Sequence, residues 1–528
     1  MISNMLCFKF VACGLLVLLY SLGFKSCSSS SSHGHGPRSY PVIGCLLAFY
    51  ENRRRLLDWY TEMLAASPTQ TIVVDRLGAR RTVVTANPAN VEHILKGNFG
   101  NYPKGKPFTD VLGDLLGKGI FNVDGELWHA QRKLVSHEFS ARTLRELEMA
   151  VLEAEALDRL LPALDAAADH PAGPGGAAVV DMQDVLRRFA FDVISRVSLG
   201  VDPGCLDPAL PTAPRLASAF DTAAGIIARR GAAPVAAVWK IKRALALGSE
   251  RRLRDEVKVI HEAVMDLIRS RKKERFLVND DNGGATRNDL LSRMIECGYA
   301  DEEIRDMVIS FIMAGRDTTS SALTWFFWLL TRHRAVERDV LDEISAMALQ
   351  HAGDSSEGGE GFDLEDFRKM RVLHAALSET MRLYPPVAWD SKHAAAGDVL
   401  PDGTRVGRGD RVTYFQYGMG RMESIWGPNA AHFSLDRWLA PSSTSSSVDA
   451  SGGVSPFRYP VFQGGPRTCL GREMAFAQMK FVACAVLRRF ELRPVDEGRT
   501  PAFLPLLTAH MDGGLKVTVR RRVEKKQH

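Results

Sequence analysis

The residues best suited to chemistry lie in a glycine- and proline-rich loop, Phe462 to Arg472, which presents a single cysteine, Cys469. A helical run over Glu473 to Phe490 follows, so exposed N–H groups and the positive end of the helix dipole should favour the thiolate form. A thiolate held there could bind a soft metal centre. Arg467 could pair with an anionic group such as a carboxylate. A lone cysteine is also often a buried, inert thiol, and residue type alone does not separate the two readings.

A second set of candidate residues lies on a long helix predicted over Asp301 to Leu330, about 45 Å in length. Apolar residues from Ile304 to Ile312 recur at helical spacing and form a stripe that continues into Ala314, Gly315 and Thr318. Glycine inside a helix costs about 1 kcal/mol relative to alanine, so something should approach the helix closely there. A flat ligand and ordinary helix packing both explain it.

Two shorter motifs place an arginine one helical turn after a partner. Glu379 and Arg382 can pair on a helix that should end at Tyr384-Pro385-Pro386, because proline stops a helix. Trp128 and Arg132 are four residues apart on another predicted helix. Each motif alone also fits a solvated surface, where an ion pair contributes only about 0.2–0.5 kcal/mol.

The whole chain has 528 residues, 45% of them hydrophobic, and a formal net charge of +5. Composition changes little along the chain and the candidate residues spread from Trp128 to Cys469, so we expect one large globular unit and a monomer. The charge is small for this length, and no nucleic-acid-binding motif occurs. The eight cysteines contain no CxxC pair, which argues against a zinc site or a disulfide framework and favours a reducing compartment.

The chain begins with an apolar segment, Met5 to Phe24, interrupted only by Lys9. About 20 residues span a bilayer as a helix, so the segment suffices if Lys9 reaches one surface. A cleaved signal peptide is the rival interpretation. Lys25 and Arg38 follow, and the positive-inside rule then places the body in the cytosol. We expect a membrane anchor over residues 1–26, a Ser- and Pro-rich linker over 27–41 and the main domain over 42–528.

Helices should predominate in the body, with small sheets near both of its ends. β-Branched runs around a glycine predict a hairpin from Thr71 to Thr85. A second hairpin is predicted from Leu506 to Val519, with Asp512-Gly513-Gly514 as its turn. The alternation of strands and helices that marks a doubly wound sheet is absent from the pattern.

The cysteine loop, Phe462-x-x-Gly465-x-Arg467-x-Cys469-x-Gly471, resembles the haem-binding loop of the cytochrome P450 superfamily at every fixed position. The resemblance implies a mainly α-helical P450 fold with small β-sheets and a bound haem b. It implies that Cys469 is the axial thiolate and that Arg467 contacts a haem propionate. Phe462 would pack beside the sulfur, with Gly471 closing the loop.

The long helix carries Ala314-Gly315-Arg316-Asp317-Thr318-Thr319, which resembles the oxygen-activation motif of the same superfamily. By this likeness Ala314 and Gly315 border the haem, Thr318 positions water, and Asp317 helps to deliver the protons that O–O cleavage consumes. The run Trp128-His129-Ala130-Gln131-Arg132 resembles the helix that gives a tryptophan and an arginine to a propionate.

Glu379-x-x-Arg382 resembles the superfamily's Glu-x-x-Arg helix, which pairs with a later arginine. Arg437, within Phe433-Ser434-Leu435-Asp436-Arg437-Trp438, occupies that later place. Leu435-Asp436 replaces the usual Pro-Glu there and leaves the arginine intact. The implied role of the three residues is structural: they would hold the haem loop.

Four further stretches resemble plant cytochrome P450 family ninety-four: Asn101-Tyr-Pro-Lys-Gly-Lys-Pro-Phe, Gly119-Ile-Phe-Asn-Val-Asp-Gly, Trp389-Asp-Ser-Lys-His and Tyr417-Gly-Met-Gly-Arg-Met-Glu. That family hydroxylates the terminal or near-terminal carbon of fatty acids, and some members hydroxylate jasmonoyl-isoleucine. The substrate would therefore be a small amphipathic carboxylate. Candidate lining residues, for which core packing is an equal reading, are Phe108, Phe121, Phe311, Val387 and Leu507.

The resemblance also implies electrons from NADPH through NADPH–cytochrome P450 reductase, and attachment to the endoplasmic reticulum membrane. Lys133, Arg472 and Lys480 could form a basic face for the reductase, or simply a solvated surface. A non-redox haem-thiolate isomerase or dehydratase and a non-catalytic haem sensor are the alternatives, and an intact Asp317-Thr318 pair disfavours both. A cysteine hydrolase lacks a companion His/Asn pattern.

Overall fold

The computed structural model describes residues 35–140, 142–169, 178–207, 214–233, 235–280, 289–354, 362–439 and 454–522. The predicted anchor and most of the predicted linker, residues 1–34, lie outside the described residues. Within the described ranges, no helix combines the length and the hydrophobicity needed to cross a bilayer. The described end of the linker contacts the body, because the N–H of Val73 donates to the carbonyl of His35 at 2.9 Å.

Helices make up most of the molecule, as expected. In chain order they are α2 (Leu46–Glu51), α3 (Leu56–Ala66), α4 (Pro88–Glu92), α5 (Gly105–Leu116), α6 (Gly125–Ser140), α7 (Arg142–Glu155), α8 (Leu161–Asp169), α9 (Met182–Leu199), α10 (Arg215–Gly231), α11 (Ala236–Ala244), α12 (Ser249–Asp280), α13 (Leu290–Glu296), α14 (Asp301–Arg332), α15 (Arg334–Asp354), α16 (Leu364–Lys369), α17 (Arg371–Leu383), α18 (Gln416–Met419), α19 (Glu423–Trp426), α20 (Asp436–Leu439) and α21 (Arg472–Arg489). The two helices predicted around the candidate residues are therefore present as α14 and α21.

The strands form small separate sheets. They are β1 (Thr71–Val74), β2 (Thr82–Thr85), β3 (Val179–Asp181), β4 (Asp390–His393), β5 (Asp398–Val399), β6 (Arg405–Val406), β7 (Arg411–Tyr414), β8 (Phe490–Pro494), β9 (Phe503–Pro505), β10 (Ala509–Met511) and β11 (Lys516–Arg521). The largest has the order β1-β2-β7-β4. β1 and β2 are the predicted hairpin, β7 runs parallel to β2, and β4 runs antiparallel to β7.

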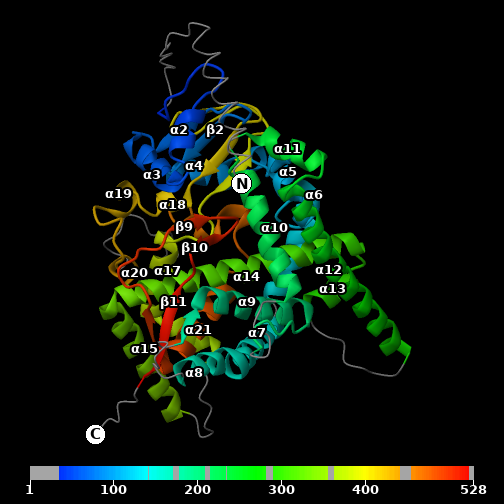
Figure 1. Cartoon of the computed structure of the whole chain (residues 1–528), viewed down its shortest axis with the longest axis vertical. Helices are drawn as coiled ribbons and strands as arrows, with labels where there is room; N and C mark the ends of the chain where they lie inside the picture. Colours follow the sequence, from blue (N-terminus) through cyan, green and yellow to red (C-terminus); the bar gives the residue numbers. More distant parts are fainter. Residues whose placement is uncertain are drawn as a thin grey trace.

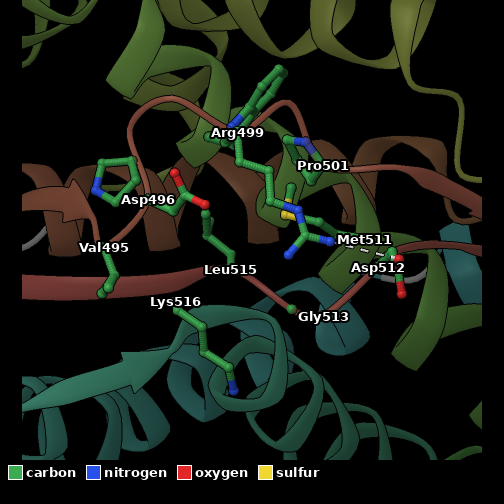
Figure 2. Close-up of a pocket in the computed structure, with 12 residues that line it drawn as sticks. Val495, Asp496, Arg499, Pro501, Met511, Asp512, Gly513, Leu515 and Lys516 are labelled. Atoms are coloured by element: carbon green, nitrogen blue, oxygen red, sulfur yellow. Dashed lines mark ion pairs between the residues drawn. The ribbon is translucent and has the colours of Figure 1, made fainter.

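The second predicted hairpin is wrong. β10 pairs back on β9, and β11 joins β8 and β3 in another sheet. Gly513 and Gly514 both have positive φ (80° and 75°), a conformation that glycine adopts without steric cost. They redirect the chain instead of folding it back, and Figure 2 shows this turn between Met511 and Leu515 beside the Arg499–Asp512 ion pair. Burial of Val517 and Val519 then holds β11 in its own sheet.

Helix α14 is the central element of the core. It crosses the middle of the molecule, between the region of α2, α3 and β2 and the region of α8, α15 and α21 (Figure 1). Acidic residues at Asp301, Glu302 and Glu303 occupy its first turn and Arg332 its last, which complements the helix dipole. Since most of its side chains from Ile304 to Leu330 are buried, α14 can present groups to an internal site in a fixed position.

Candidate active site

The cysteine loop is held by its own backbone. The N–H of Cys469 donates to the carbonyl of Phe462 at 2.8 Å, which closes the loop just before α21. Gly465 has φ of 61°, and a Cβ atom there would collide with the carbonyl oxygen of Leu95. Only glycine tolerates both conditions, so this fixed position of the motif has a steric explanation.

The thiol of Cys469 lies on the wall of a cavity of about 740 Å³. Most of the predicted site residues line the same cavity. Those from the haem-type motifs are Arg132, Ala314, Gly315, Thr318, Phe462, Arg467, Cys469 and Gly471. The five apolar candidates, Phe108, Phe121, Phe311, Val387 and Leu507, line it as well. The structure thus brings together residues from α5, α6, α14 and the loops around β4, β10 and α21.

Trp128 and Asp317 do not line the cavity. Trp128 is 3% exposed, and its ring lies beneath the guanidinium of Arg467 with 4.4 Å between them. Asp317 is 5% exposed, and its Oδ1 has no hydrogen-bond partner among the described residues. Its charged neighbour is Arg316, whose Nε is 3.7 Å from that oxygen and which also pairs with Asp221.

The two arginines beside Cys469 are anchored to protein groups. Arg132 donates to the carbonyl of Thr468. Arg467 donates to the carbonyl of Val123 at 2.9 Å and to Asp124 Oδ1 at 2.7 Å. Burial lowers the pKa of both guanidiniums, and each still carries its charge. Their positive ends are therefore fixed in place before an anion arrives.

The electrostatic environment of Cys469 differs from the expectation. Burial raises the pKa of its thiol, while a hydrogen bond from the backbone of Gly471 and the charges of Arg132 and Arg472 act in the opposite direction. The position ahead of α21 does not by itself favour thiolate. Since a metal ligates the deprotonated sulfur, metal binding would supply the missing stabilisation.

Helix α14 explains its own glycine by packing. A Cβ atom on Gly315 would lie 2.6 Å from Cδ1 of Ile194 on α9, which is too close for unchanged packing. Gly315 also lines the cavity, so the helix contact and an approaching ligand share the position. The hydroxyl of Thr318 donates to the carbonyl of Ala314 at 2.6 Å, which leaves its oxygen lone pairs facing other partners.

Glu379, Arg382 and Arg437 form a buried network and not a surface pair. The side chains of Glu379 and Arg382 are both 0% exposed and share two bonds of 2.7 Å. Arg437 Nε lies 3.2 Å from Glu379 Oε1, and Trp438 Nε1 donates to Oε2 at 2.9 Å. Arg382 also donates to main-chain carbonyls, including that of Ala430 at 2.6 Å.

This network is tied to the segment that leads into the haem-type loop. The hydroxyl of Tyr459 donates to the carbonyl of Ser378 on α17 at 2.9 Å. The ring of Tyr459 packs against Trp438 with 5.1 Å between centroids. A shift of α17 would therefore move the start of the loop.

A second buried charge cluster was missed from the sequence. Asp390 on β4 accepts from Lys104 at 2.8 and 2.9 Å and from Lys392 and Tyr414 at 2.8 Å. Burial lowers the pKa of Lys392 to about 7, and the two lysines hold the pKa of Asp390 well below its usual range despite burial. The hydroxyl of Tyr414 also contacts the side-chain amide of Gln463 in the haem-type loop. Two of the family-like stretches, around Lys104 and Trp389, contain these residues, but nothing in their spacing indicates the contact.

The predicted basic face is incorrect at one position. Lys133 and Arg472 are exposed. Lys480 is 3% exposed and donates to the carbonyls of Phe367 and Met370, so it caps the end of α16 internally. Its burial also lowers its pKa, to about 8.

The donor set and the cavity fit haem b. One thiol, two fixed guanidiniums and an apolar wall are the groups that a haem with two propionates requires. Arg132 and Arg467 lie at the cavity wall with Cys469, so all three could contact one planar ligand. The small side chains of Ala314 and Gly315 leave room on the α14 wall.

Comparisons with known proteins agree with this geometry. The family model for Cytochrome P450 matches residues 35–514. Cytochrome P450 94B1 and Cytochrome P450 94B3, both of Arabidopsis thaliana, are each 53% identical over 96% of this chain and cover 95% and 97% of their own lengths. Cytochrome P450 94A1 of Vicia sativa is 40% identical over 92% of this chain and 90% of its own.

The solved structure of the cytochrome P450DA heme domain superposes with a TM-score of 0.74 over 94% of this chain and 99% of that one, at 20% identity. That likeness shows the P450 fold. The family implies a haem with cysteine thiolate ligation and electrons from a redox partner. On these grounds the chain belongs to the cytochrome P450 family, within plant family ninety-four, and is a haem-thiolate monooxygenase.

Proposed function

We propose that this monooxygenase hydroxylates the terminal or near-terminal carbon of an acyl chain that carries a carboxylate, either a fatty acid or jasmonoyl-isoleucine. The supporting observation is that one cavity joins the Cys469 thiol to a long apolar wall. Phe108, Phe121, Phe311 and Val387 would contact the chain, and burial of its methylenes contributes about 0.8 kcal/mol each. The chain end would then lie near the haem and the carboxylate far from it.

The roles of the cavity residues follow from their contacts. Haem, when bound through Cys469, supplies the oxygen chemistry. Arg132 and Arg467 would bind its propionates, which are already matched by fixed positive charge. Ala314 and Gly315 would border its face, and Phe462, which packs on Phe476 at 5.4 Å, would shield the sulfur from water.

Proton delivery would use α14. Thr318 would accept a hydrogen bond from a water in the cavity, because its own proton is given to Ala314. Asp317 lies one residue away, outside the cavity wall, and connects through Arg316 to Asp221 on α10. Asp317 would supply protons to that water, while Arg316 would hold the Asp317 carboxylate in position without carrying protons itself, because a guanidinium stays protonated.

Electrons would come from NADPH–cytochrome P450 reductase, with Lys133 and Arg472 contributing to its contact surface. We also propose that residues 1–26 anchor the protein in the endoplasmic reticulum membrane and residues 42–528 form the catalytic domain in the cytosol. Removal of residues 1–32 should release the protein from microsomes with its haem retained. Persistent tight membrane binding of that truncated protein would contradict the anchor.

The substrate is tested by incubating the haem-loaded protein with the reductase, NADPH, and either a medium-chain fatty acid or jasmonoyl-isoleucine. Mass spectrometry should detect a product 16 mass units heavier, the mass of one oxygen atom, with the hydroxyl at or next to the chain end. Mid-chain hydroxylation, or no product from either acid, would contradict the proposal.

A further inference from the structure

Two arginines, Arg76 and Arg411, line the cavity without a carboxylate partner in the described part of the chain. Neither Arg76 nor Arg411 forms an ion pair with any residue in the described ranges, and both are half-buried. Arg76 Nη1 is buried and has no hydrogen-bond partner among the residues that the structure describes, and its guanidinium lies 4.1 Å over the ring of Phe49. Arg411 Nε donates to Ser391 Oγ at 2.9 Å, a neutral group that does not balance its charge.

The register of the β1-β2-β7-β4 sheet brings the two arginines to one end and one face of the sheet. Thr82 on β2 pairs with Val74 of β1 on one side and with Arg411 of β7 on the other. Directly paired residues of neighbouring strands share a face, and Arg76 follows Val74 by two residues. The closeness of the two charges shows in the pKa of Arg411, which burial and then repulsion from Arg76 lower.

The groups around the pair do not neutralise it. Burial raises the pKa of Tyr60 to about 12 and also raises the pKa of Cys45, so both are uncharged near pH 7. The charge of Asp390 also acts on Arg411, but that carboxylate is already bound by Lys104 and Lys392. A half-buried pair of like charges is unfavourable until an anion arrives.

The other cations of the cavity wall are committed or solvated. Arg230 pairs with Asp114 and Glu250, Lys104 with Asp390, Lys106 with Asp110, and Arg467 with Asp124. Arg132 is bound to the carbonyl of Thr468. Arg80 and Lys240 also line the cavity, but both are exposed, so a carboxylate there would remain in water.

We infer that Arg76 and Arg411 form the site that binds the carboxylate of the substrate. The inference rests on the proposed function and identifies where its acidic end is held. Two guanidiniums can present several parallel N–H donors to one carboxylate. With the carboxylate fixed at this end of the sheet, the length of the acyl chain would decide which carbon reaches the haem.

The inference is tested with Arg76→Gln, Arg411→Gln and the double variant, each loaded with haem. The dissociation constant is read from the change in the haem absorption spectrum on titration with dodecanoic acid, jasmonoyl-isoleucine and the methyl ester of each. Loss of one charged hydrogen bond should weaken binding of the acid about ten- to a hundredfold. The dissociation constants of the uncharged esters should change by less than about threefold.

Controls separate charge from folding. Arg408→Gln removes an exposed arginine three residues before the start of β7 that does not line the cavity, and should leave the preference for acid over ester unchanged. Arg411→Lys keeps a charge and should retain part of the preference. The reduced-CO absorption band of each variant shows that its haem site is intact.

Each outcome is decisive. If the wild-type protein hydroxylates either acid and the double variant keeps its acid preference, the arginine site is overturned and the proposed function stands. If acid and ester lose affinity equally, the arginines act on the shape of the cavity and the inference is again overturned. If the wild-type protein binds and hydroxylates neither acid, the proposed function fails, and the inference with it.

Discussion

The two ends of the cavity are built in opposite ways. At the Cys469 end, Arg132 and Arg467 already donate hydrogen bonds to acceptors of the protein. The nearby network joins the side chains of Glu379, Arg382, Arg437 and Trp438 and is buried at its centre. At the β1–β2 end, Arg76 and Arg411 have no carboxylate partner among the described residues. At the first end, called the complete end below, both arginines already have partners before any ligand binds. The second has a charge imbalance that a ligand would relieve, which is where selectivity for a substrate can arise.

The largest effect is expected at the centre of the complete end. Cys469→Ser removes the only sulfur of the haem-type loop. The reduced-CO band of the haem-thiolate should therefore disappear, along with all hydroxylation. Cys297→Ser, which changes an exposed cysteine directly after α13 that does not line the cavity, should leave the band intact. A normal band in the Cys469 variant would remove the basis for the whole site.

The next largest effect should come from the buried network. Glu379→Gln leaves the guanidinium of Arg382, 0% exposed, without its counter-charge, and such losses destabilise a protein by about 3–5 kcal/mol. We expect a large fall in the temperature of haem loss, measured by absorption during heating. Glu365→Gln removes an exposed partner of Arg368 and should cause no such fall. If both variants behave alike, the network does not support the haem loop.

A third test separates proton delivery from structure. Thr318→Ala should retain haem but reduce product formed per NADPH consumed, by on the order of tenfold or more, because water is no longer positioned in the cavity. Thr324→Ala removes the same type of helix hydrogen bond, 2.7 Å to Ser320, at a buried position away from the cavity wall. Unchanged coupling in the Thr318 variant would exclude the proposed role.

The complete end is also the part that sequence predicts well. Gly465 and Glu379 stand at fixed spacings because a close carbonyl and a buried ion pair each restrict the residue type, and Cys469 stands where the family's haem requires a thiolate. Long amphipathic patterns likewise predict α14 and α21. The features that the sequence did not reveal depend on contacts between distant segments. They are the partners of β10 and β11, the Lys104–Asp390–Lys392 cluster, and Arg76 and Arg411 at one end of the β1-β2-β7-β4 sheet. Residue type in those places is common, and only the fold gives it meaning.

A fourth test concerns Gly315 on α14, which lies both on the cavity wall and against Ile194 of α9. Gly315→Ala should destabilise the protein by about 1–3 kcal/mol, because the new methyl group collides with Ile194. Ile194→Ala should relieve the collision, so the double variant should be more stable than the sum of the single changes predicts. Thermal unfolding of the haem-loaded variants measures this coupling. Strict additivity would mean that the glycine is kept for the ligand and not for the helix contact.

The smallest expected effect tests whether the buried polar groups near the Cys469 end all have hydrogen-bond partners. Glu148 on α7 is 2% exposed, its Oε1 lacks a hydrogen-bond partner among the described residues, and burial raises its pKa to about 8. Because the folded state holds the proton more tightly than the unfolded chain, this carboxyl does not reduce stability below about pH 4.5. The carboxyl destabilises the fold increasingly as the pH rises from about 4.5 to 8, and the penalty levels off above pH 8.

Glu148→Gln should therefore stabilise the protein by about 1 kcal/mol at pH 8 and by less at pH 5, as measured by thermal unfolding at the two pH values. Glu153→Gln changes an exposed carboxylate on the same helix and should show no such pH dependence. An equal effect of Glu148→Gln at both pH values would mean that the carboxyl is already satisfied. In that case the contrast between the fully partnered Cys469 end and the unpaired arginines of the β1–β2 end would be larger still.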